Sequence, residues 1–147
     1  MNYQQEAVAD VLDEIRPLLD MHWREVSHYQ DIQLRPDWDF YCTAQGIRLY
    51  TARDEGRLIG YCVFFVSHNK HYMDSMQAVQ DILFVHPEYR GSRAGYRLIK
   101  FCDEQLRQEG CQVVYQHMKA AQSFGPLLEH AGYELVDLIY AKRLDKE

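Results

Sequence analysis

The segment from Val85 to Gly95 holds the residues best suited to bind an anion. Its sequence is Val-His-Pro-Glu-Tyr-Arg-Gly-Ser-Arg-Ala-Gly. Pro87 and Gly91 favour a turn after an apolar strand, and a helical pattern begins at Ala94. The first backbone N–H groups of a helix have no partner within the helix and lie at its positive dipole end. The segment therefore predicts a strand-to-helix junction that binds phosphate groups.

Arginine side chains add positive charge to this junction. Arg90, Arg93 and Arg97 lie within one turn of the helix start, and guanidinium groups match phosphate oxygens. The chain as a whole is acidic, with 16 Lys and Arg against 22 Asp and Glu and a net charge of -6. This balance argues against general nucleic-acid binding and favours a cationic or neutral substrate. On the residues alone, a solvated helix start covered by arginines is an equal alternative to a phosphate site.

Asp81 is the leading candidate for a general base. It belongs to the run 78–85, in which even- and odd-numbered positions are both apolar except for Gln80 and Asp81. This pattern is typical of a central strand that is covered on both faces. We expect Asp81 to lie on the same strand face as Leu83, two residues later. A carboxyl group in such apolar surroundings has a raised pKa and is suited to accept a proton. The alternative is a carboxylate that is hydrogen-bonded to a neighbouring loop.

His117 is the second catalytic candidate, near the end of a strand expected over 112–118. An imidazole titrates near neutral pH, although a solvated histidine at a strand end is the plainer reading. The His68-x-x-His71 pair has no third ligand nearby, so we expect no metal site. The cysteines form no Cys-x-x-Cys motif and are expected to be reduced core residues: Cys42, Cys62, Cys102 and Cys111.

The length and composition predict a single compact domain over residues 1–147. The 147 residues are 47% hydrophobic and 13% aromatic, without a repeat or a low-complexity stretch. The N-terminus carries no signal-like pattern, and no apolar run approaches the ~20 residues of a membrane span. We therefore expect a cytoplasmic protein that does not associate with membranes.

The hydrophobic periodicity predicts an α/β fold, a mixed sheet flanked by helices. Pro17 is expected to break or kink the first helix, and Asp54-Glu55-Gly56 predicts a hairpin between two strands. The expected elements are helices near 8–19, 21–26 and 38–45, strands over 47–53, 58–66 and 78–85, a helix over 94–109, a strand over 112–118, a helix over 123–130 and a strand over 133–144.

The junction resembles motif A of the GNAT acyltransferase superfamily, a glycine-rich turn after a strand that ends in Val-x-Pro. The matching residues are Leu83-Phe84-Val85-His86-Pro87-Glu88-Tyr89-Arg90-Gly91 and Arg93-Ala94-Gly95. The segment 127–133, Leu-Leu-Glu-His-Ala-Gly-Tyr, is similar to the family's closing helix and its Gly-Phe turn. The order of elements matches over almost the whole chain, and the sequence most resembles small phage and prophage members. The resemblance implies a GNAT-like, mostly antiparallel central sheet flanked by helices.

The resemblance also implies a function, acetyl transfer from acetyl-coenzyme A to a primary amine by direct attack in a ternary complex. The expected cofactor-binding residues are Leu83, Phe84, Val85, Arg90, Gly91, Ser92, Arg93, Ala94 and Gly95. Two positions depart from the family pattern. Arg93 replaces a motif glycine, and Leu128 replaces the tyrosine that many members use as the general acid. A catalytically weak or inactive coenzyme A-binding protein that acts through a host partner is the alternative, and a homodimer is possible because family members often pair.

Overall fold

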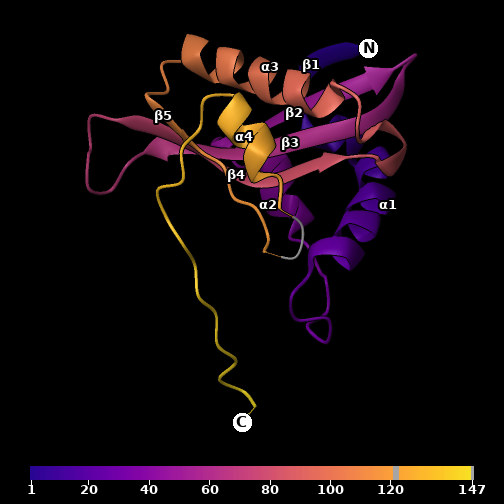
Figure 1. Cartoon of the computed structure of the whole chain (residues 1–147), viewed down its shortest axis with the longest axis vertical. Coiled ribbons are helices and arrows are strands. Elements are labelled where there is room, and N and C mark those ends of the chain that lie inside the picture. Colours follow the sequence, from indigo (N-terminus) through magenta and orange to yellow (C-terminus); the bar gives the residue numbers. More distant parts are fainter. Residues whose placement is uncertain (121–122, 147) are drawn as a thin grey trace.

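The computed structural model describes residues 1–120 and 123–146. Its centre is a five-stranded sheet with the strand order β1-β2-β3-β4-β5, drawn in Figure 1. The elements are β1 (Asn2–Glu6), α1 (Val8–Val26), α2 (Trp38–Thr43), β2 (Ile47–Asp54), β3 (Arg57–His68), β4 (Met76–Val85), the 3-10 helix η1 (Pro87–Tyr89), α3 (Ala94–Gln108), β5 (Val113–Tyr115) and α4 (Gly125–His130).

Helices cover both faces of the sheet, with α1 and α3 on opposite sides (Figure 1). The apolar stripe of α1 packs with Leu49, Tyr61 and Phe84 in one core cluster. The stripe of α3 packs on the other face in a second cluster, which includes Tyr50 and Phe64. Each helix thus buries one face, as an amphipathic helix on a sheet does. The predicted α/β class, a mixed sheet flanked by helices, is confirmed.

The connections explain why the sheet is mixed. Strands β1 to β4 pair antiparallel with their neighbours. Helix α3 then carries the chain back, so that β5 pairs parallel with β4. The turn between β2 and β3 has positive φ at Glu55 (50°) and Gly56 (84°), which suits a tight hairpin. The predicted hairpin is therefore present.

Two features at the N-terminal end differ from the prediction. Strand β1 was not expected, because its residues Asn2–Glu6 are mostly polar; it forms because β2 offers a free edge. Helix α1 continues through Pro17 as one element, so the predicted break is wrong. Pro17 is exposed, whereas Ile15 and Leu19 on either side of it are buried against the sheet. The packing on both sides outweighs the hydrogen bond that proline removes.

The C-terminal part also differs. Strand β5 spans only Val113–Tyr115 instead of 112–118. The strand predicted over 133–144 is wrong, because these residues belong to no helix or strand. Figure 1 shows them, in yellow, leaving α4 and running away from the sheet. A strand needs a partner strand, and no strand in the described part of the chain pairs with this segment.

Candidate functional site

Asp81 lies at a β-bulge in β4. Along β3, Val63 pairs with Ile82 and the next residue pairs with Gln80, so Asp81 faces no partner. A bulge inserts one residue and re-aims its side chain. Asp81 consequently lines a cavity between the sheet and α1, whereas Leu83 packs with the cluster on the α3 face. The prediction that Asp81 and Leu83 share a strand face is therefore wrong.

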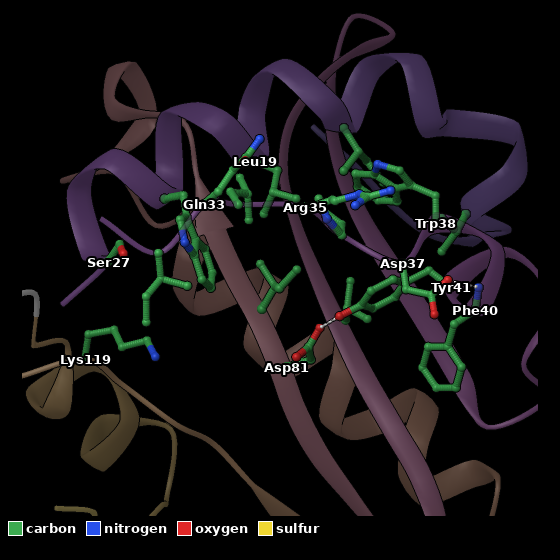
Figure 2. A pocket seen from close by; sticks show the side chains of 18 of the residues that line it. Leu19, Ser27, Gln33, Arg35, Asp37, Trp38, Phe40, Tyr41, Asp81 and Lys119 are labelled. Atoms are coloured by element: carbon green, nitrogen blue, oxygen red, sulfur yellow. Dashed lines mark hydrogen bonds between the residues drawn. The ribbon is translucent and has the colours of Figure 1, made fainter. Parts of the chain in front are cut away.

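The cavity beside Asp81 has a volume of about 580 Å³ and mostly aromatic and aliphatic walls. Figure 2 shows α1 on one side and the strands on the other, with Asp81 pointing in from β4. Its aromatic walls come from α1, α2, β3 and the loop between the two helices, and comprise Trp23, Tyr29, Trp38, Phe40, Tyr41 and Tyr61. Such a cavity, apolar with a few polar groups, is typical of a small-molecule site.

The Tyr41 hydroxyl donates a hydrogen bond of 2.6 Å to Asp81 Oδ2, marked by the dashed line in Figure 2. Helix α2 holds Tyr41 there, and the Asp37 side chain caps this helix by accepting from Phe40 N at 3.1 Å. Burial raises the pKa of Asp81, while the Tyr41 hydrogen bond and the electrostatic influence of His117 and Lys119 lower it by less. Asp81 is thus a carboxyl group whose proton affinity exceeds the ordinary value.

His117 and Lys119 follow β5 in the chain and lie close enough to Asp81 to affect its pKa. The backbone N–H of His117 donates to Gln80 Oε1 at 2.7 Å, which fixes the chain beside the bulge. The His117 side chain is exposed and does not line the cavity. Lys119 does line it, with its Nζ 6.0 Å from the centre of the Trp23 ring, and Figure 2 shows its side chain extending toward the cavity.

The two parallel strands separate just before Asp81. β5 pairs with β4 only from Gln77↔Val113 to Val79↔Tyr115. Beyond that point, in the described part of the chain, residues 80–85 of β4 have a partner strand only in β3. An open strand edge accepts an extended ligand as if it were another strand. This edge leads from Asp81 to the strand-to-helix junction.

The junction itself forms a set of unpaired backbone donors. Gly91 has φ +87°, a conformation that favours glycine. Within the described chain, no acceptor receives a hydrogen bond from the backbone N–H groups of Gly91, Arg93, Gly95 or Tyr96. A Cβ on Gly95 would lie 3.6 Å from Val85 Cγ2, so the helix start lies close to the end of β4. The residues present therefore fit a phosphate group at the helix N-terminus.

The arginines of this junction have different surroundings. Arg90 forms a bidentate pair with Glu25 of α1, at 2.6 and 3.1 Å, and its Nε donates to the Val85 carbonyl at 2.9 Å. Arg93 is exposed and has φ -86°. This φ is open to any residue, so the replacement of a motif glycine by Arg93 strains no backbone. Arg97 is exposed on the first turn of α3.

His22 is a polar group near this site that the sequence did not single out. It lies on α1 with its ring 5.2 Å from that of Phe84, and its buried Nδ1 has no partner among the described residues. Burial lowers the pKa of His22 to about 4, so its ring is neutral at physiological pH. The sequence of this amphipathic helix did not indicate that His22 would be buried, because its burial depends on packing against β4.

The C-terminal helix carries the second departure from the family pattern. Leu128 on α4 is buried, with 7% of its surface exposed, and an aliphatic side chain supplies no proton. The described residues contain no cluster of metal-ligating side chains. Among the helices described, none has the length and apolarity needed to cross a membrane.

Three features define an acyltransferase type of fold and site. They are the separation of β4 and β5 beyond Val79 and Tyr115, the unpaired backbone N–H groups of the junction, which we call the amide cradle, and the aromatic cavity beside Asp81. Residues 12–124 match the model of the acetyltransferase (GNAT) family, and the chain belongs to this family, whose cosubstrate is acetyl-coenzyme A.

Known proteins agree with this assignment. The chain is 42% identical over 65 residues to the Uncharacterized N-acetyltransferase YjhQ of Escherichia coli K12, a match that covers 44% of this chain and 36% of that protein. The solved ribosomal-protein-alanine N-acetyltransferase of Brucella melitensis biovar Abortus 2308 superposes with a TM-score of 0.74 at 18% identity, covering 98% of this chain and 100% of that one. Aminoglycoside N-acetyltransferase AAC(6')-Iy in complex with CoA gives 0.70 at 17% identity, covering 97% and 99%. At these identities the solved structures establish the fold.

Proposed function

We propose that this chain transfers an acetyl group from acetyl-coenzyme A to a primary amine, by direct attack while both substrates are bound. The observation that carries the proposal is the place of Asp81. Its carboxyl group lies at a bulge between the aromatic cavity and the open edge of β4. An acyl donor along that edge and an amine in the cavity meet at this carboxyl group.

The amide cradle and the β4 edge support the donor site. Among the described residues, the free N–H groups of Gly91, Arg93, Gly95 and Tyr96 suit the pyrophosphate. Leu83 and Phe84 offer backbone groups to the pantetheine arm. The Val85 carbonyl is already bonded to Arg90, so it contributes less than the sequence suggested. The bound cosubstrate supplies a thioester carbonyl for the amine to attack and a sulfur that leaves as a thiolate.

Asp81 supports the proton transfer. An alkylammonium group has a pKa near 10.4 and must lose a proton before its nitrogen can attack. Asp81 accepts that proton directly or through one water, and its raised pKa makes the transfer easier. Lys119 and the solvated His117 lie close enough to act on the charge of Asp81, and we assign His117 the role of passing the proton on to solvent.

The cavity walls favour a particular class of acceptor, a monoamine on an aromatic or aliphatic body. Six aromatic side chains suit such a body. Among the described residues, the charged groups that line the cavity are two carboxylates, Asp37 and Asp81, and two cations, Arg35 and Lys119. These groups give the cavity no excess of negative charge. A polycation such as an aminoglycoside finds less compensation there than a single ammonium group does.

Leu128 supports one alternative, a catalytically weak coenzyme A-binding protein that acts through a host partner. The reaction does not require the missing acid, because a thiol with a pKa of roughly 8.5 leaves fairly well as the thiolate. A general acid typically contributes about 10²- to 10⁴-fold. We therefore expect a slow enzyme instead of an inert one.

Calorimetry and a thiol-release assay test the proposal in sequence. We expect acetyl-coenzyme A and coenzyme A to bind and ATP to bind far more weakly. Thiol release should then be faster with phenylethylamine or hexylamine than with spermidine or an aminoglycoside. Binding without release from any amine supports the regulatory alternative, and no binding of either coenzyme contradicts both. The single-domain extent over residues 1–147, the cytoplasmic location and the kinship with phage members stay predictions.

A further inference from the structure

Two cationic side chains at the aromatic cavity have no carboxylate partner. Arg35 and Lys119 both line the cavity, and Figure 2 shows them reaching it from different sides. In the described part of the chain, no carboxylate lies within ion-pair distance of either side chain. The carboxylates of the cavity are engaged elsewhere, because Asp37 caps helix α2 and Asp81 is bonded to Tyr41. The cavity therefore offers positive charge to an anionic group of a ligand.

Lys119 is the cation that lies near the proposed base. The His117 N–H donates to Gln80 Oε1 at 2.7 Å, and Gln80 directly precedes Asp81 in β4. Lys119 follows His117 by two residues, which span at most about 7 Å. Although burial raises the pKa of Asp81, the charge of Lys119 lowers it, whereas Arg35 has no such effect. The two cations therefore lie in different parts of the cavity, one beside the base and one away from it.

Trp23 holds the Lys119 side chain at the cavity mouth. Lys119 Nζ lies 6.0 Å from the centre of the Trp23 ring, a distance at which the face of the ring attracts a cation. The ring carries no net negative charge, so the ammonium group keeps its capacity to bind an anion. A lysine ammonium has three donors and binds a carboxylate as a point charge. Lys119 is thus positioned by its neighbour without being neutralised.

We infer that the acceptor carries a carboxylate beside its amine, which makes it a free α-amino acid with an aromatic or aliphatic side chain. A single carbon atom separates the two groups in such a molecule, so the base and the cation that bind them must lie close together. Asp81 and Lys119 meet this requirement. The amine then lies at Asp81, the carboxylate at Lys119 and the side chain among the aromatic walls of the cavity. This substrate class rests on the proposed acetyl transfer and specifies its acceptor.

A protein amine fits this arrangement less well. The carbon that bears a lysine ε-amine carries no carboxylate, and the carbon that bears an N-terminal amine is followed by a neutral peptide group. Either acceptor leaves Lys119 without an anionic partner. A free amino acid brings one charge of each sign, which matches one carboxylate and one ammonium group at the cavity. The pair of Asp81 and Lys119 thus favours free amino acids over proteins.

For an amino acid, the transfer moves two protons and one electron pair. One proton of the ammonium group passes to Asp81, and the nitrogen then forms a bond with the acetyl carbonyl carbon. The bond from that carbon to sulfur breaks, and its electron pair leaves with the sulfur. A second proton of the nitrogen neutralises the thiolate, directly or through water, and Asp81 returns its proton to solvent. The N-acetylamino acid keeps its carboxylate at Lys119 but no longer presents a positive charge to Asp81.

Three acceptors that differ only beside the amine test this substrate class. L-phenylalanine carries a carboxylate there, phenylalaninamide a neutral amide and phenylethylamine a hydrogen atom. We expect kcat/KM for phenylalanine to exceed that for phenylalaninamide roughly tenfold, because the amide loses a charged hydrogen bond. Lys119→Gln should lower this ratio by about the same factor. Lys119 is exposed, so circular dichroism should show unchanged folding. Lys100→Gln, at an exposed position on α3, is the matched control and should leave the ratio unchanged.

Binding provides a second readout that needs no turnover. In calorimetry with the chain saturated with coenzyme A, phenylalanine should bind more tightly than phenylalaninamide, and Lys119→Gln should remove the difference. Comparison of each ratio between the proteins cancels the different reactivity of the two amines. A ratio near one in the natural chain, or a preference for phenylalanine that survives in Lys119→Gln, overturns this substrate class while acetyl transfer to other amines stands. Thiol release from none of the amines overturns the transfer itself, and this substrate class with it.

Discussion

The Tyr41 hydroxyl and the Asp81 carboxylate, 40 residues apart in sequence, meet at 2.6 Å on the wall of the aromatic cavity. Tyr41 stabilises the charged form of Asp81, whereas burial stabilises the neutral form and has the larger effect. The hydrogen bond therefore holds the pKa of Asp81 lower than burial alone would set it. In the proposed reaction, Tyr41 is a positioning residue that adjusts the proposed base.

Replacing Tyr41 by Phe should move the pH dependence of the reaction. Asp81 acts as a base when it is ionised, so kcat/KM should rise with pH through the pKa of Asp81. Loss of the Tyr41 hydrogen bond removes a cause that lowers this pKa, so the rise should move to higher pH. The measurement is kcat/KM against pH for a fixed amine. Phe40→Leu, a neighbouring change that leaves the hydrogen bond in place, should not move the profile.

Replacing Asp81 by Asn should remove the base while keeping the size of the side chain. We expect kcat to fall by about 10²- to 10⁴-fold and the rise of kcat/KM with pH to disappear. Coenzyme A affinity, measured by calorimetry, should stay the same because the cradle is untouched. Full activity of Asp81→Asn across the pH range would falsify the assignment of Asp81 as the base.

Gly91→Ala should weaken coenzyme binding. Alanine at φ +87° costs about 1 to 2 kcal/mol, and relief of that strain turns the junction amides away from the phosphates. Loss of one amide bond to a phosphate weakens affinity roughly tenfold. Gly56→Ala is a matched control, because Gly56 has φ +84° and equally open surroundings in the β2–β3 turn. Both variants should lose similar stability in thermal unfolding, and only Gly91→Ala should lose affinity by calorimetry.

The sequence predicts those parts of the fold and site that depend on local chemistry. The hairpin turn needs positive φ at Gly56, and the junction depends on the turn and the helix start that surround Gly91. Both signals lie within a few residues. Helix α3 likewise follows from an apolar stripe that contains Leu98 and Cys102.

The sequence alone does not predict features that depend on residues far apart in the chain. The bulge at Asp81 arises from the register between β3 and β4, and strict alternation placed its side chain on the wrong face. The contact of Tyr41 with Asp81 joins elements that the sequence does not link. Strand β1 exists because β2 has a free edge. The segment after Tyr133 has a strand-like composition but no partner strand in the described part of the chain. In each case, the missing information is the identity of the neighbour.

Lys119→Glu should change acceptor preference. Lys119 is a cation at the cavity mouth, and its reversal makes the cavity attractive to polyamines. We expect the ratio of kcat/KM for spermidine to that for hexylamine to rise, most clearly at low ionic strength. The loss of a positive charge also raises the pKa of Asp81, so the two kcat/KM values should be measured well above neutral pH. Lys100→Glu, an exposed position on α3, carries the same charge change and should leave the ratio unaltered.

His22 should make the fold less stable in acid. Its pKa in the folded chain is about 4, against roughly 6.5 when unfolded, because burial disfavours the charged ring. The unfolded chain therefore binds a proton that the folded chain does not, and the free energy of unfolding falls as pH drops from about 6.5 to about 4. We expect a loss of roughly 1 to 2 kcal/mol, since the ring keeps some contact with solvent. Urea unfolding at several pH values measures it. His22→Leu should make the free energy of unfolding less dependent on pH between about 4 and 6.5. His68→Gln, at an exposed position, should leave this dependence unchanged. The same dependence in the natural chain and in both variants would contradict the role given to His22.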